Sequence, residues 1–138
     1  MPDTRPGGPA GTPSAPTAVV RPLCNVRELT GHDSLPSGAL WKLAEAGRQL
    51  DANVIHLPAG QVVETHAEPD LDVLLMVVAG HGTMDTAERT EQLTVGNLMW
   101  MPHGSSRRIT ASDEGLCYFT VHRRRPGMQI RSRAELGR

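Results

Sequence analysis

The chain has 138 residues, of which 38% are hydrophobic and 21% charged, and its formal net charge is −1 at pH 7. This length suffices for one small domain and excludes two separate cores. The balanced charge argues against nucleic acid as a partner, and no apolar run reaches the roughly 20 residues that span a bilayer, so no membrane partner is expected. The N-terminus has no apolar signal segment, and Cys24 and Cys117 form no CxxC pair, so a cytoplasmic protein is expected.

The composition divides the chain into three regions. Six of the 11 prolines lie within residues 1–22, so residues 1–25 are predicted to be a disordered Pro/Gly-rich leader, because such a segment buries too little apolar surface to offset the entropy of ordering. Residues 132–138 are polar and are expected to form a loose tail. The folded domain is therefore predicted to span residues 26–131.

Short runs with a period of two dominate this domain and predict strands. In chain order these runs are residues 39–44, 49–57, 61–66, 71–79, 82–85, 92–95, 98–101, 106–110 and 116–123. Turn residues separate many of them, at positions 58–60, 79–82, 96–97, 102–104 and 113–115. Many short strands with turns between them are typical of a sandwich or a small barrel, so the predicted class is all-β.

Two segments need a choice between structures. Residues 38–47 suit a helix with Ser37 as its N-cap, and they equally suit a strand that turns back into the next one. We favour the hairpin, because every later segment reads as strand. Residues 71–79 are almost continuously apolar, which predicts a strand that is covered on both faces.

Two spaced motifs resemble those of the cupin superfamily. The segment Gly60-Gln-Val-Val-Glu-Thr-His66-Ala-Glu68, followed by a strand that ends at Gly80, is similar to the first cupin motif, G-x5-H-x-H-x3-4-E-x6-G. The segment from Gly96 to Ala111 contains Pro102, Gly104 and Arg107 and is similar to the second motif, G-x5-P-x-G-x2-H-x3-N. The resemblance implies a small antiparallel double-sheet barrel of the jelly-roll kind, open at one end and often paired into dimers.

The resemblance also implies where a metal would be held. Cupins that bind a metal use two histidines and a carboxylate from the first motif and a histidine from the second. The corresponding residues here are His66, Glu68, Val73 and Arg107. Only the first is kept, and a guanidinium has no lone pair to donate and repels a cation, so the metal positions are degenerate.

Two interpretations of these positions remain open. Without a metal, Glu68 and Arg107 form an ion pair inside the barrel and His66 hydrogen-bonds to one of them. With a metal, His66 and Glu68 share one face of a strand and begin a site for Fe, Mn, Zn or Ni. The third ligand would then come from Asp72, His81 or His103. We favour the metal-free interpretation, with no cofactor, because it explains two substitutions at once.

The same positions predict a small-molecule site. Arg107 at the mouth of a barrel suits a bidentate contact to a carboxylate or phosphate. Trp100 or Met101 would supply an apolar wall, and Tyr118 a hydrogen-bond donor. The candidate ligand-binding residues are thus His66, Glu68, Arg107, Trp100, Met101 and Tyr118.

Three functions fit these observations. The leading one is a metal-free barrel that binds a small, anionic molecule or acts as an accessory protein. The first alternative is a metal-dependent enzyme of the dioxygenase or isomerase type that uses His66 and Glu68. The second is a scaffold or regulatory homodimer that pairs through an edge formed by residues 39–57. The sequence leaves open whether the protein is an enzyme.

Overall fold

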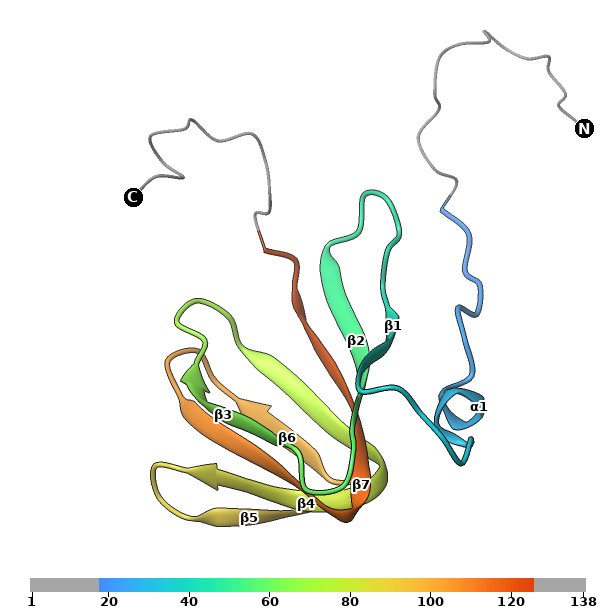
Figure 1. The fold of residues 1–138 in the computed structure, drawn as a ribbon. Helices are drawn as coiled ribbons and strands as arrows, with labels where there is room; N and C mark the ends of the chain where they lie inside the picture. Colours follow the sequence, from blue (N-terminus) through green and yellow to red (C-terminus); the bar gives the residue numbers. More distant parts are fainter. Residues whose placement is uncertain (1–17, 126–138) are drawn as a thin grey trace, which may run out of the picture.

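The computed structural model describes residues 18–125, which form one short helix and seven strands (Figure 1). The elements are α1 (Val26–Thr30), β1 (Gly38–Lys42), β2 (Leu50–Leu57), β3 (Val62–Ala67), β4 (Val73–Thr86), β5 (Thr90–Thr94), β6 (Leu98–Met101) and β7 (Ser106–Arg123). The predicted all-β class is confirmed. Residues 1–17 of the predicted leader and all of the predicted tail lie outside the described residues, and residues 18–25 contain no helix or strand.

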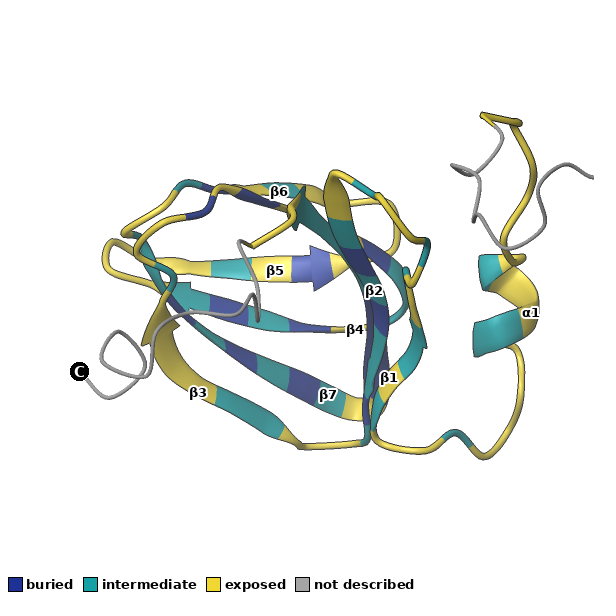
Figure 2. Cartoon of the chain, turned by 90° about the horizontal axis from the view of Figure 1, so that it is seen from above, coloured by how far each residue is buried: buried dark blue, intermediate teal, exposed yellow. Residues whose placement is uncertain are grey.

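The strands form two antiparallel layers that share the two longest strands, β4 and β7 (Figures 1 and 2). The beginning of β4 and the end of β7 pair with each other, with Leu74 opposite Val121. β6, β2 and β1 complete this first layer. The end of β4 and the beginning of β7 form the second layer with β3 and β5. The result is the predicted double-sheet barrel.

Two predicted turns are bends inside continuous strands, which corrects the sequence-based boundaries. The runs 71–79 and 82–85 join into β4, and the runs 106–110 and 116–123 join into β7. At the bend, Gly80 and Gly115 have φ angles of 70° and 83°. A Cβ on Gly80 would collide with the carbonyl oxygen of Gly115, so the two strands approach this closely only because Gly80 has no side chain.

The core lies between the two layers and follows the period of two. In β4, Val73, Leu75 and Val77 are buried, whereas Leu74 and Met76 are 40% and 38% exposed. The prediction that this strand is covered on both faces is therefore wrong for the described chain. Leu74 and Met76 lie opposite Trp100 and Leu98 of β6, which are 60% and 63% exposed, and we call these four side chains the apolar outer face.

Residues 38–57 form the predicted hairpin, with β1 antiparallel to β2. The helix α1 was not predicted, although its start has a recognisable signal. Asn25 caps it by accepting a hydrogen bond from the backbone N–H of Glu28 at 3.1 Å. No helix in residues 18–125 is both long and apolar enough to cross a membrane.

Candidate functional site

A cavity of about 250 Å³ lies between the two layers, at the end of the barrel away from the bend. Its apolar wall consists of Val63, Val73, Leu75, Met101 and Ile109. Its polar wall consists of His66, Glu68, Arg107, Tyr118, Thr120, His122 and Arg125. All four positions that correspond to cupin metal ligands therefore border one cavity.

An irregularity in β3 turns His66 toward this cavity. Val63 pairs with Ile109 and His66 pairs with Arg107, so the stretch between them holds one residue more on β3 than on β7. A regular strand would place Thr65 on the same face as Val63, because side chains alternate. The extra residue reverses the alternation, and His66 lies against the cavity instead.

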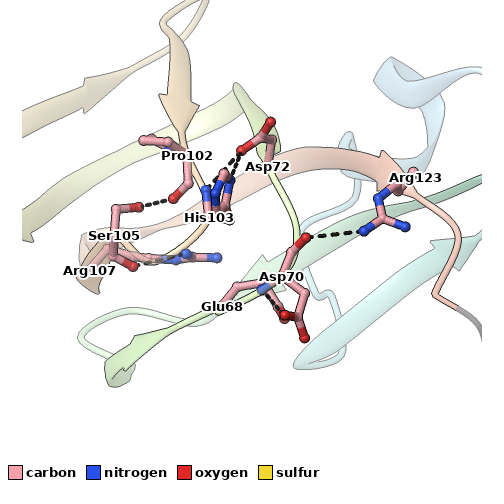
Figure 3. Close-up of polar contacts among 8 residues, drawn as sticks. All are labelled: Glu68, Asp70, Asp72, Pro102, His103, Ser105, Arg107 and Arg123. Atoms are coloured by element: carbon pink, nitrogen blue, oxygen red, sulfur yellow. Dashed lines mark hydrogen bonds and ion pairs between the residues drawn. The ribbon is translucent and has the colours of Figure 1, made fainter.

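Arg107 is the charged residue that the barrel buries most deeply among the described residues, with 7% of its surface exposed. Its guanidinium donates one long hydrogen bond, 3.4 Å from Nη1 to the carbonyl oxygen of Ser105 (Figure 3). No carboxylate of residues 18–125 lies within ion-pair distance of it. Burial lowers the pKa of Arg107, and the nearby Glu68 and Tyr118 oppose that shift, so the side chain keeps its charge near neutral pH.

Tyr118 presents a second polar group without a protein partner in the described chain. It is 6% exposed, lines the cavity, and its hydroxyl makes no hydrogen bond to any residue of the described range. Burial raises the pKa of Tyr118 to about 12, despite the opposing effect of the Arg107 charge. The phenol therefore remains protonated near neutral pH and available as a donor.

The predicted ion pair between Glu68 and Arg107 is wrong. Glu68 instead pairs with Arg125, at 2.7 Å from Oε1 to Nη2. This hydrogen bond from Arg125 is the main reason that the pKa of Glu68 lies below its ordinary value. The cavity is thus bordered by one neutralised carboxylate and one cation, Arg107, that has no matching anion.

The two histidines of the cavity have defined tautomers in their neutral forms. His66 Nδ1 lies 3.1 Å from the carbonyl oxygen of Glu64, and His122 Nδ1 lies 2.7 Å from that of Arg123. Because a carbonyl oxygen only accepts, the proton lies on Nδ1 in both rings and Nε2 carries the lone pair. The predicted hydrogen bond of His66 to Glu68 or Arg107 is not among the contacts of the described residues.

Four predicted candidates lie away from the cavity. Asp72 and His103 bind each other at the surface, 2.8 Å from Oδ1 to Nδ1, and the backbone N–H of His103 donates to the same oxygen (Figure 3). His81 lies 3.4 Å from Glu114, close to the bend. Trp100 belongs to the apolar outer face, so Met101 is the one of this pair that lines the cavity.

The sequence did not assign part of the polar wall, and it left the direction of His122 open. Thr120 and His122 follow Tyr118 at steps of two along β7, so all three share a face. Once Tyr118 is placed inside the barrel, this alternation predicts that Thr120 and His122 also face inward. Arg125 follows the end of the strand, where no pattern predicts a direction.

The donor set does not fit a bound metal of the cupin type. His66 and Glu68 are the only two of the four positions with a lone pair, and Glu68 is already bound to Arg125. Val73 has no donor atom, and Arg107 repels a cation. In the described part of the chain, no three His, Cys, Asp or Glu side chains lie together in a way that would hold a metal ion.

Comparison with known proteins gives a clear result for the fold alone. No protein-family model and no curated protein sequence matches this chain. Among solved structures, a Bacillus halodurans protein matches with a TM-score of 0.61 and 19% identity over 77% of this chain and 85% of its own. A cupin-2 domain protein of Shewanella frigidimarina matches with a TM-score of 0.59 and 16% identity over 74% of this chain and 95% of its own.

A third match carries a named activity. It is a sugar phosphate isomerase of the cupin superfamily from Silicibacter pomeroyi, with a TM-score of 0.53 and 18% identity over 57% of this chain and 53% of its own. Because one fold hosts many activities, this likeness does not assign an activity here. The shared double-sheet barrel, with the two sequence motifs on the strands that surround its cavity, identifies this chain as a cupin-fold protein.

Proposed function

We propose that the barrel binds a small anionic organic molecule in its cavity and that Arg107 is the anchor for the anion. The single observation that carries this proposal is the burial of the Arg107 guanidinium in the cavity wall without a carboxylate partner in the described chain. A buried charge that lacks a partner is costly, and an anionic ligand would remove that cost on binding.

The size of the cavity limits the ligand. Its volume of about 250 Å³ is below the roughly 300–1,000 Å³ of typical pockets for drug-sized molecules. The ligand is therefore a small metabolite, well below a nucleotide or a disaccharide in size. The geometry supports binding of a ligand and identifies no group that would react with it. An accessory or sensory role therefore follows more directly than catalysis.

Thermal unfolding in the presence of simple anions tests the proposal. We expect sodium acetate or inorganic phosphate to raise the melting temperature of the wild-type protein relative to sodium chloride at equal ionic strength. A ligand at ten times its Kd adds about 1.4 kcal/mol to the free energy of unfolding, which is about 6 °C for a domain of this size.

The matched variants are Arg107→Gln and Arg108→Gln. Arg107 is buried in the cavity wall, whereas the side chain of Arg108 is 39% exposed and contacts Glu64 and Asp85. The anion-dependent increase should disappear in Arg107→Gln and persist in Arg108→Gln. An equal increase in both variants would show that the anions act elsewhere and would refute the proposal.

A further inference from the structure

The cavity combines a paired set of hydrogen-bond donors with an apolar wall, which narrows the class of ligand. Arg107 and Tyr118 are 7% and 6% exposed and border the same cavity. They come from the two ends of one bent strand, β7, which brings the guanidinium and the phenol to facing layers of the barrel. Neither has a carboxylate, a carbonyl at ordinary distance or a hydroxyl as a partner within residues 18–125.

Five of the ten other residues that line the cavity are apolar. Val73 and Leu75 lie beside each other on one face of β4, and Met101 pairs directly with Val73 from β6. Val63 and Ile109 form a cross-strand pair in the second layer. A ligand bound to Arg107 and Tyr118 therefore has five apolar side chains in the same cavity against which a hydrocarbon body can pack.

The number and type of the donors distinguish between anions. A planar carboxylate has two oxygens, which suits one guanidinium fork and one added O–H donor. A phosphate group has three terminal oxygens and up to two negative charges, and its usual sites add backbone N–H groups from a loop or a helix end. Ten of the 12 residues that line the cavity here lie in strands, and none of them lies in a helix.

We infer that the ligand is a small amphiphilic monocarboxylate, whose carboxylate is bound by the Arg107 guanidinium and the Tyr118 hydroxyl and whose apolar body contacts Val63, Val73, Leu75, Met101 and Ile109. This inference rests on the proposed function and specifies its ligand class. A cavity of about 250 Å³ holds on the order of eight water-sized groups, which corresponds to a chain of about six carbons with its carboxylate.

Three probes with eight non-hydrogen atoms each test the class. Hexanoate has the charge and shape inferred, hexanamide has the same shape without charge, and butylphosphonate carries a phosphorus oxyanion on a shorter chain. Protein-observed NMR titration of the full chain suits ligands of this size, because it measures dissociation constants in the millimolar range. We expect hexanoate to bind at least tenfold more tightly than either of the other two.

Two variants assign the donors. Tyr118→Phe removes only the hydroxyl, and since that hydroxyl has no protein partner in the described chain, the fold should be retained. We expect Tyr118→Phe to raise the Kd of hexanoate about tenfold and to change the Kd of hexanamide by less than about twofold. Arg107→Gln should remove the preference for hexanoate over hexanamide. Leu75→Ala, which enlarges the cavity, should shift the preference toward octanoate.

The outcomes separate this inference from the proposed function. If acetate and phosphate stabilise the wild type through Arg107 but butylphosphonate binds as tightly as hexanoate, the carboxylate class is wrong while anion binding stands. If Tyr118→Phe binds hexanoate like the wild type, the assignment of Tyr118 is wrong. If no anion acts through Arg107, the proposed function fails and this inference fails with it.

Discussion

Glu68 binds Arg125, with 2.7 Å between Oε1 and Nη2, and so leaves Arg107 buried without a carboxylate partner in the described chain. The two arginines are thus divided between two roles. Arg125, two residues after the end of β7, neutralises the carboxylate at the border of the cavity. Arg107 remains the charge that the barrel interior exposes to a ligand, and this division underlies the first prediction.

Replacing Arg107 with methionine should stabilise the ligand-free protein. The substitution removes a buried cation without a partner and keeps a side chain of similar length, so the free energy of unfolding should increase by about 1–2 kcal/mol. Urea denaturation of wild type and Arg107→Met measures this change. Arg108→Met, at a more exposed position, should change it by less than about 0.5 kcal/mol. A lower free energy of unfolding in Arg107→Met would mean that the guanidinium stabilises the folded barrel, and it would contradict this prediction.

Gly80→Ala should destabilise the barrel strongly, because Gly80 combines a positive φ with the close approach to Gly115. Gly96 is the matched control, since its φ of 94° is also positive but a Cβ there would meet nothing within 4 Å. We expect a loss of more than about 3 kcal/mol for Gly80→Ala, against about 1–2 kcal/mol for Gly96→Ala, where only backbone strain is added. Equal losses in a denaturant titration would show that the collision is relieved by a small shift of the strands.

Stability should depend on the charge of Glu68 at acid pH. Arg125 holds the pKa of Glu68 below its ordinary value of 4.5 in the folded protein. The unfolded chain therefore binds this proton more readily, and the stabilisation is complete above about pH 4.5 and is lost as the pH falls through the folded pKa. In Glu68→Gln, the free energy of unfolding should decrease less between about pH 5 and 3 than it does in the wild type. An exposed control, Glu88→Gln, should leave the curve unchanged, and identical curves for all three proteins would contradict the prediction.

Purified protein should contain no stoichiometric metal. Only His66 and Glu68 have donor atoms at the four cupin positions, and Arg107 stands at the fourth. Mass spectrometry with an inductively coupled plasma, on untagged wild type and on His66→Ala, should find less than about 0.1 equivalent of Fe, Mn, Zn or Ni in both. Near-stoichiometric metal in the wild type that is absent from His66→Ala would contradict this prediction. It would favour a metal-dependent enzyme over a metal-free binding protein.

The protein should form a homodimer through the apolar outer face. Leu74, Met76, Leu98 and Trp100 are uncharged neighbours on paired strands, and a twofold axis would bring this patch against its own copy. Sedimentation velocity should give a dimer for the wild type and a monomer for Trp100→Lys. Val20→Lys, at a fully exposed apolar position outside the sheet, serves as the control and should remain dimeric. A dimer that is lost in Ala39→Lys but kept in Trp100→Lys would place the contact at the edge strand β1.

The sequence alone predicted those elements that are determined by residues close together along the chain. The period of two and the turn residues located the strands, and β6 was placed at its observed bounds, Leu98–Met101. The alternation of side chains placed His66 and Glu68 on one face of a strand. Both features depend on neighbours along the chain, and a single sequence contains that information. The resemblance to the two cupin motifs added Arg107 to the same site, and all three residues border one cavity.

Tertiary structure decided what depends on residues far apart. Glu68 and Arg125 are 57 positions apart, and their distance in space, which no local pattern encodes, gave Glu68 its partner instead of Arg107. The close approach of Gly80 and Gly115 likewise turned two predicted turns into bends, because a glycine pattern indicates freedom of the backbone without saying which strand passes beside it. Patterns along the chain specify which groups face inward, whereas the pairing of charges depends on distances that only the packed barrel sets.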